Sequence, residues 1–146
     1  MRPVSGTYAL VLRSAIRSGI AIGRWGTLEL RRGYYVYVGS AFGPGGVRAR
    51  VGRHCRGATA RHWHVDYLRE FTSPVAVWCG YAPVRREHHW ADAFGRMPGM
   101  RPVSGFGCSD CRCAAHLFYS TKRPQASEFT TLAGDDIEIC RCTAGG

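Results

Sequence analysis

A glycine-rich break between two segments of different periodicity constrains the fold of this chain most. Residues 43–46 read Gly-Pro-Gly-Gly, a combination that interrupts both strands and helices. The aromatic and β-branched run 34–38 before the break predicts a strand. Residues 47–54 after it show the i, i+3, i+4 and i+7 spacing of a helix face. We therefore expect a strand, a tight turn and a helix in direct succession.

The other segments are short and alternate between strand and helix signals. Residues 6–13 and 20–22 are rich in strand formers, and together with 34–38 they predict a small antiparallel sheet. The chain of 146 residues has room for one domain, so we expect an α/β (α+β) domain over 1–120 and a partly irregular tail over 121–146. Further elements are expected at 62–71 (helix), 75–81 (strand), 84–95 (helix) and 115–120 (strand).

The positive charge indicates an anionic partner. The formal net charge is +10, and Lys122 is the only lysine among the 20 basic residues. Arginine keeps its charge and contacts phosphate at two points, which favours nucleic acid as the partner. A solvated basic surface explains the composition equally well. The arginines between residues 13 and 61 are Arg13, Arg17, Arg24, Arg31, Arg32, Arg48, Arg50, Arg53, Arg56 and Arg61.

Neither a membrane segment nor a disulfide framework is expected. No apolar run approaches the ~20 residues that span a bilayer, and the N-terminal segment lacks the pattern of a signal peptide. We therefore expect a cytoplasmic protein without a membrane partner. The chain has seven cysteines, an odd number, and a chain of this size can build a core without disulfides. Reduced thiols are the expectation, and the oligomeric state stays open.

Two tyrosines lie in the predicted strands. Tyr8 and Tyr37 carry hydroxyls that need partners if they face inward, and that can accept or relay a proton where they meet at a cleft. Tyrosines in strands are also common as packing residues.

The predicted helix 47–54 carries polar groups on its apolar face. Arg50 and His54 lie one turn apart, on the same face as Val47 and Val51. A guanidinium next to an imidazole, just after a glycine-rich loop whose backbone can approach a ligand closely, suits a phosphodiester. A solvated basic face is the alternative.

A single acid interrupts the apolar line of the predicted helix 84–95. Glu87 lies in line with Val84, Ala91 and Phe94. Burial of an unpartnered carboxylate costs on the order of several kcal/mol, so Glu87 should pair with an arginine or a metal. Mg²⁺ is commonly held through one or two carboxylates and the phosphates of a substrate, so Glu87 is a candidate ligand.

The sequence resembles a known superfamily. The motifs at 6–8 and 37–39 read GTY and YVG, which is similar to the paired signature of the GIY-YIG nucleases. The strings GYYVYVGSAFGPGGVRARVGRHCR, HWHVDYL and GFGCSDCRCAAHLFY resemble its small prokaryotic branch, catalogued as a domain of unknown function and sometimes fused to endonuclease III. The resemblance covers about residues 5–120. It implies a central three-stranded antiparallel sheet flanked by helices, and hydrolysis of DNA phosphodiester bonds with one divalent cation, Mg²⁺ or Mn²⁺.

The resemblance also implies roles for single residues. Tyr8 and Tyr37 match the tyrosines of the two half-motifs, Arg50 the catalytic arginine, His54 the residue one turn later, and Glu87 the metal-binding glutamate. In members of the superfamily that incise DNA during repair, a lysine follows the glycine of the second half-motif, whereas this chain has Ser40 there. The segment 19–31 is expected to form an additional hairpin. We expect contacts to nucleic acid from Arg24, Arg31, Arg32, Ser40, Arg48 and Arg53.

These residues lead to a main hypothesis and two alternatives. The main hypothesis is a metal-dependent DNA endonuclease, structure-selective or non-specific, which acts in DNA repair or processing and can be recruited by a DNA-repair protein. The first alternative is a catalytically silent nucleic-acid-binding module. The second is a zinc-binding interaction domain, which is suggested by four closely spaced cysteine and histidine residues. Buried apolar cysteines and a histidine in the core explain these four residues as well. These four ligands are Cys108, Cys111, Cys113 and His116.

Overall fold

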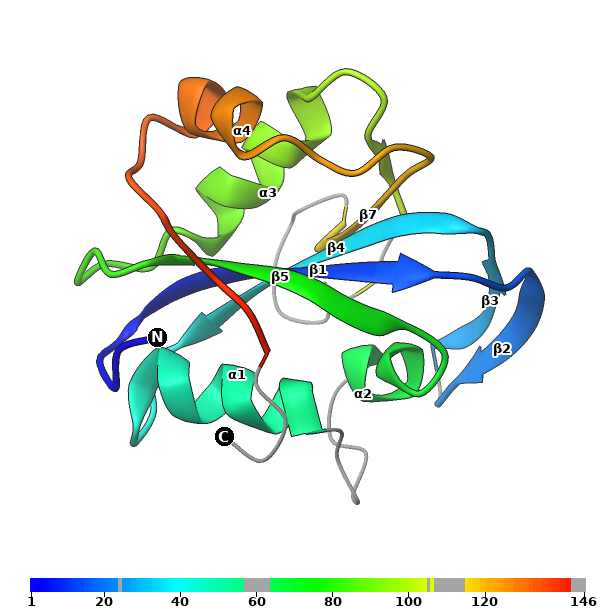
Figure 1. Ribbon diagram of the computed structural model, residues 1–146, viewed down its shortest axis with the longest axis horizontal. Coiled ribbons are helices and arrows are strands. Elements are labelled where there is room, and N and C mark those ends of the chain that lie inside the picture. Colours follow the sequence, from blue (N-terminus) through cyan, green and yellow to red (C-terminus); the bar gives the residue numbers. More distant parts are fainter. Residues whose placement is uncertain (24, 57–63, 105, 107–114, 143–146) are drawn as a thin grey trace.

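The computed structural model of the protein describes residues 1–23, 25–56, 64–104, 106 and 115–142 (Figure 1). The strands of its main sheet are β1 (Gly6–Ser14), β4 (Gly33–Ala41), β5 (Ser73–Gly80), β6 (Arg101–Pro102), β7 (Leu117–Ser120) and β8 (Glu138–Cys140). They lie in the order β6-β7-β4-β1-β5-β8, and each neighbouring pair is antiparallel. The long strands β4, β1 and β5 form its centre.

Helices cover both faces of this sheet. They are α1 (Gly46–Arg56), α2 (His64–Arg69), α3 (Glu87–Arg96) and α4 (Ala126–Ala133). Figure 1 shows α1 and α2 on one face, and α3 and α4 on the other. Among the described residues, no helix has both the length and the apolar character needed to cross a bilayer.

The central strand β1 divides the core into two halves. Tyr8 and Leu10 belong to the cluster that contains Val47 of α1, whereas Ala9 belongs to the opposite cluster, with Phe94 of α3. Side chains alternate along a strand, so a strand that is covered on both faces must be apolar at almost every position. The nearly continuous apolar sequence of β1 follows from this position.

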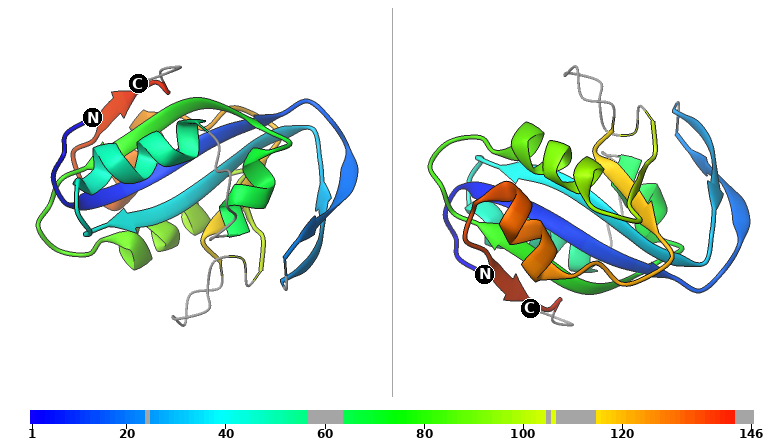
Figure 2. Two further views of the ribbon diagram at one scale, coloured as in Figure 1. Left: turned by 90° about the horizontal axis from the view of Figure 1, so that it is seen from below. Right: turned by 90° about the horizontal axis from the view of Figure 1, so that it is seen from above.

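The predicted α+β architecture with an antiparallel sheet and flanking helices is confirmed, but one expected strand lies elsewhere. Residues 20–22 belong to β2 (Ser18–Ile22), which pairs with β3 (Gly26–Leu30) in a separate two-stranded sheet. This hairpin is the additional one expected over 19–31, and Figure 2 shows it projecting from one end of the domain. In the main sheet, β5 pairs with β1 instead. Periodicity indicates that a strand forms, but it does not indicate its partner.

The helix expected over 84–95 begins only at Glu87. Val84 is 58% exposed and precedes the helix, so it does not continue the apolar line. Arg86 explains the late start: its backbone N–H donates to Oγ1 of Thr7, and its guanidinium binds Asp135. Glu87 is therefore the first residue of α3 and lies at the edge of its buried face.

Residues after Thr121 form regular structure that the sequence pattern does not predict. Phe129 of α4 is fully buried and stacks on Phe94 of α3, with ring centroids 4.4 Å apart. Strand β8 pairs with the outer edge of β5. The segment expected as a partly irregular tail thus contributes a helix and a strand to the domain.

The expectation of reduced thiols is wrong for one pair, because Cys55 and Cys142 form a disulfide. It links the end of α1 to the segment after β8 across 87 residues of sequence. In the chain-entropy model, closing a loop of this size stabilises the folded state by about 4 to 5 kcal/mol. Sequence spacing does not reveal which cysteines pair, and this pair depends on β8 lying beside β5.

Backbone N–H groups at the amino end of α1 donate hydrogen bonds to the N-terminal segment of the chain. The backbone N–H groups of Val47 and Arg48 donate to the carbonyl oxygens of Val4 and Arg2. Gly46 has a φ of +60°, and its Cα lies against the backbone of Val4, where a side chain has no room. We expected the glycine-rich loop to let a ligand approach the backbone. It instead lets the N-terminal segment approach, and that segment satisfies these amides.

Candidate active site

A buried hydrogen bond joins the first predicted tyrosine to the predicted histidine. Tyr8 on β1 is 1% exposed, and its hydroxyl lies 2.9 Å from Nε2 of His54 on α1. Gly39 is opposite Tyr8 in the β1–β4 pair, and a Cβ atom there would lie 2.6 Å from Cζ of the phenol. Glycine at position 39 thus provides the space in which the tyrosine ring lies.

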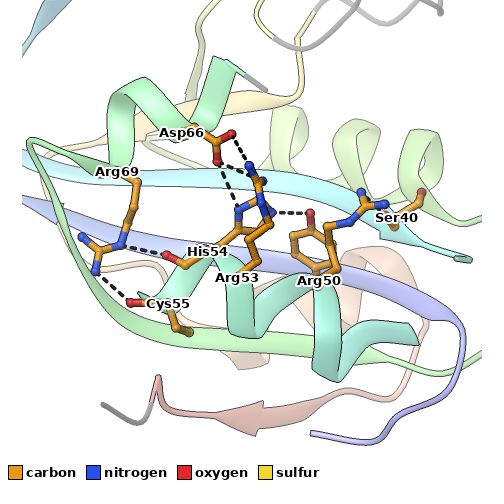
Figure 3. A network of polar contacts seen from close by, with 8 residues as sticks. Ser40, Arg50, Arg53, His54, Cys55, Asp66 and Arg69 are labelled. Carbon is orange, nitrogen blue, oxygen red and sulfur yellow. Dashed lines mark hydrogen bonds and ion pairs between the residues drawn. The ribbon is translucent and has the colours of Figure 1, made fainter. Parts of the chain in front are cut away.

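The other ring nitrogen of His54 faces a carboxylate. Nδ1 lies 3.8 Å from Oδ1 of Asp66 on α2, and both side chains are 2% exposed. Arg53 donates to the two oxygens of the same carboxylate at 3.3 and 3.1 Å (Figure 3). A carboxylate beside Nδ1 favours a proton on that nitrogen, which leaves Nε2 to accept the hydroxyl proton of Tyr8. Asp66, His54 and Tyr8 therefore form a buried carboxylate–imidazole–phenol chain.

Burial keeps Tyr8 and His54 uncharged near neutral pH. It raises the pKa of Tyr8 well above the usual value; Tyr37 raises it further and Arg50 lowers it. Burial also lowers the pKa of His54 to about 4, although Asp66 acts in the opposite direction. Tyr8 therefore carries its proton at neutral pH, and His54 keeps a free electron pair with which to accept one.

The low pKa of His54 makes stability depend on pH in a defined window. Between the unfolded-state pKa near 6.5 and the folded-state pKa of about 4, the unfolded chain binds a proton at this residue and the folded chain does not. The contribution is complete above pH 6.5 and is lost as the pH falls toward 4, by about 3 kcal/mol in total.

Urea unfolding at several pH values between 7 and 4.5 measures this effect, and His54→Gln is the reference variant because it removes the titrating group. The native protein should lose more stability than the variant over this range. Parallel pH profiles of the two proteins would contradict the low pKa of His54.

Tyr37 and Arg50 complete the group on this face of the sheet. The ring centroid of Tyr37 lies 6.5 Å from that of Tyr8 and 6.2 Å from that of His54. Nη1 of Arg50 donates to the backbone oxygen of Ser40 at 3.3 Å (Figure 3). The structure thus brings together the four residues predicted from the two strands and the helix.

Glu87 reaches the same place from the opposite face. Ser40 donates from Oγ to Oε1 of Glu87 at 2.9 Å, while its backbone oxygen accepts from Arg50. Oε2 of Glu87 lies 3.3 Å from Nδ1 of His116, which immediately precedes β7. Glu87 is also close enough to raise the pKa of Tyr8. The end of β4 at Ser40 is therefore where the two faces of the sheet meet.

The residues around Glu87 fit a divalent cation. Glu87, His88 and His116 each offer one oxygen or nitrogen, and these atoms all lie within 4.8 Å of one another. Burial lowers the pKa of His116, with Glu87 acting against this effect, so the ring favours the neutral form that coordinates metals. A second group of this kind within the described residues is Cys79, Glu138 and Cys140, at the β5–β8 edge.

Basic side chains surround the outer side of α1. Arg48, Arg56 and Arg141 line a groove with a volume of about 520 Å³. A smaller hollow of about 150 Å³ lies between the glycine-rich loop and Arg50. Both are open to solvent on the helix that carries the predicted catalytic arginine.

The other residues expected to contact nucleic acid differ in their positions. Arg31, Arg32 and Arg48 are exposed. Arg53 instead binds the buried Asp66, and Ser40 binds Glu87. Outside the described residues lie Arg24, Cys108, Cys111 and Cys113.

Sequence reasoning missed three residues of this site. The sequence pattern indicated His116 only as a candidate zinc ligand, and it did not single out Asp66 or His88. Asp66 reaches His54 across the sequence through α2, and His116 reaches Glu87 from the far side of β4. For Asp66 the available signal is a charged residue between the apolar residues Val65 and Leu68.

The chain belongs to a family that has been recognised by sequence. This family is described as Domain of unknown function DUF123, and it matches residues 7–138. The matched region contains the five residues predicted as catalytic, together with Asp66 and His116. Searches of curated proteins and of solved structures found no match.

Proposed function

We propose that this protein is a metal-dependent DNA endonuclease of the GIY-YIG type that hydrolyses phosphodiester bonds. The observation that carries the proposal is the buried hydrogen bond between Tyr8 and His54, set beside Arg50 and close to Glu87. Packing alone does not require a phenol, an imidazole, a guanidinium and a carboxylate at one end of the central strands, whereas phosphoryl transfer uses each of them.

The proton of the attacking water follows the hydrogen bond between Tyr8 and His54. Tyr8 takes this proton as it gives its own to Nε2 of His54, so the phenol never holds a full negative charge in its buried position. Asp66 faces Nδ1 and stabilises the imidazolium that forms. In this relay Tyr8 accepts the proton, because its hydroxyl lies 2.9 Å from Nε2 of His54.

Groups on both faces of the sheet can stabilise the negative charge of the phosphoryl group. The guanidinium of Arg50 lies beside the end of β4 on the α1 face and stabilises negative charge on the phosphoryl oxygens. A divalent cation bound at Glu87 would neutralise charge on the phosphate and on the leaving oxygen. The new bond joins the water oxygen to phosphorus, the bond to the leaving oxygen breaks, and that oxygen takes up a proton.

The basic surface supports a nucleic-acid substrate. The groove lined by Arg48, Arg56 and Arg141 lies against α1, the helix that also carries Arg50, although Arg50 does not line it. Side-chain guanidinium groups bind phosphates without reading bases, which agrees with structure-selective or non-specific cleavage. We propose on the same basis that a DNA-repair protein directs this activity.

A plasmid-nicking assay with Mg²⁺ or Mn²⁺ tests the proposal. The native protein should nick DNA, and EDTA should stop the reaction. Glu87→Gln should nick at least about tenfold more slowly, since even the loss of a group that merely orients a metal ligand costs 10- to 100-fold.

Nicking that is unaffected by this substitution would indicate a contaminant and would overturn the proposal. Salt-sensitive binding of branched, damaged and single-stranded DNA without any cleavage would favour the catalytically silent module instead.

A further inference from the structure

The residues beside Glu87 form a more specific site than a single carboxylate. Glu87 and His88 are consecutive at the start of α3, and His116 faces them from the chain that leads into β7. Oε2 of Glu87 is 3.3 Å from Nδ1 of His116, and the centroids of the two imidazole rings lie 5.8 Å apart. The three donor atoms lie within 4.8 Å of one another. One carboxylate and two imidazoles therefore converge on one point.

Two of the three donors are held in place by neighbouring groups. His116 is 3% exposed, and its backbone is bonded on both sides: its carbonyl accepts from Val38, and its N–H donates to Phe106. Glu87 receives a hydrogen bond from Ser40 at 2.9 Å. Burial restricts the ring of His116, and a hydrogen bond that orients a ligand, as Ser40 orients Glu87, is typical of metal sites.

The third donor lies on the open side of the cluster. His88 is exposed, so its side chain can move without disturbing the core. Ligands of one ion at 2.0–2.2 Å lie at most about 4.4 Å apart. The donor atoms here lie within 4.8 Å of one another, so only a small movement of His88 is needed to bring all three within reach of one ion.

The donor types select the class of ion. Mg²⁺ prefers an octahedron of oxygen ligands and keeps several waters, whereas imidazole nitrogen suits divalent transition metals. Two histidines and one carboxylate with open positions is an arrangement used for such ions. We propose that Glu87, His88 and His116 bind one divalent transition-metal ion in preference to Mg²⁺.

The inference rests on the proposed function only for the role of the ion in hydrolysis, because binding can be measured without DNA. Mn²⁺ is the probe, because it is paramagnetic and because soft thiolate sites such as Cys79 and Cys140 select other metals. Titration of the full chain with Mn²⁺, followed by electron paramagnetic resonance, gives the affinity. Pulsed measurements on the bound ion detect coupling to imidazole nitrogen.

The native protein should bind one Mn²⁺ with nitrogen coupling, and more than a tenfold excess of Mg²⁺ should be needed to displace it. His116→Ala and His88→Ala should each weaken binding by about tenfold or more and reduce the coupling. His89→Ala is the matched control, because His89 contacts the backbone oxygen of Ala133 instead. This variant should bind Mn²⁺ like the native protein.

The outcomes separate the two proposals. Native-like affinity in both His88→Ala and His116→Ala, or bound Mn²⁺ without nitrogen coupling, would overturn the site while leaving a nuclease that uses Glu87 alone. Absence of Mn²⁺ binding would overturn the inference and would leave Glu87 and His116 with a structural contact only. Nitrogen-coupled Mn²⁺ without DNA cleavage would support the site and contradict the proposed function. Because His88 is exposed, loss of folding is not expected for His88→Ala, and circular dichroism checks this.

Discussion

Tyr8→Phe is expected to slow DNA cleavage by about 10²- to 10⁴-fold, the range that a positioned acid or base contributes. The substitution removes the hydroxyl that lies 2.9 Å from Nε2 of His54. It keeps the aromatic ring that occupies the space over Gly39, so the packing of β1 against β4 is retained. Single-turnover cleavage at saturating Mn²⁺ measures the effect on the chemical step.

Tyr35→Phe is the matched control for this substitution. Tyr35 is also buried on the face that contains Leu10, but its hydroxyl accepts a hydrogen bond from the backbone of Arg31, away from His54. Both variants lose one hydroxyl hydrogen bond, which costs about 1 kcal/mol of stability. Only Tyr8→Phe should lose cleavage. Equal rates in the two variants would show that Tyr8 takes no part in proton transfer.

Asp66→Ala should lower the free energy of unfolding by about 3 to 5 kcal/mol, because it removes one partner of a buried ion pair. The carboxylate is 2% exposed and receives two hydrogen bonds from Arg53. Without it, the half-buried guanidinium loses both of these hydrogen bonds, and Nδ1 of His54 loses the carboxylate that it faces. Equilibrium unfolding in urea at pH 7 without reductant measures the loss while the Cys55–Cys142 disulfide stays intact.

An exposed aspartate provides the comparison for this measurement. Asp92 pairs with Arg96 one turn later on α3, with side chains 67% and 52% exposed. Exposed pairs of this spacing contribute about 0.3 to 0.5 kcal/mol, so Asp92→Ala should change stability little. A similar, small effect of both substitutions would mean that Asp66 does not hold α1 and α2 together as described.

Local sequence patterns were sufficient for the elements that carry most of the site. The helical spacing of residues 47–54 correctly placed Val47, Val51 and His54 toward the core, where all three are buried. The strand signals of 6–13 and 34–38 correspond to β1 and β4, whose pairing brings Tyr8 and Tyr37 close. The existence of these elements depends on periodicity within one segment, which a sequence displays directly, whereas the pairing of β1 with β4 is known only from the structure.

Contacts between distant elements could not be predicted in this way. The bond between Ser40 and Glu87 needs α3 to cross the face opposite to α1, and the ion pair of Asp66 needs α2 to lie beside α1. Helix α4 was missed because its main anchor is a single aromatic residue, Phe129, whose partners come from α3 and β5. The local sequence pattern of an element does not indicate which distant elements will pack against it.

The hydrogen bonds between the N-terminal segment and the amino end of α1 have a consequence for any anion that approaches this helix. Because the backbone N–H groups of Val47 and Arg48 already donate to the carbonyls of Val4 and Arg2, an approaching phosphate meets arginine side chains instead of these main-chain donors. Attraction of that kind is set by the counterions that are displaced, and it falls steeply with ionic strength. It also tolerates many backbone shapes, so under the proposed function any discrimination between substrates arises where β4 ends near Ser40.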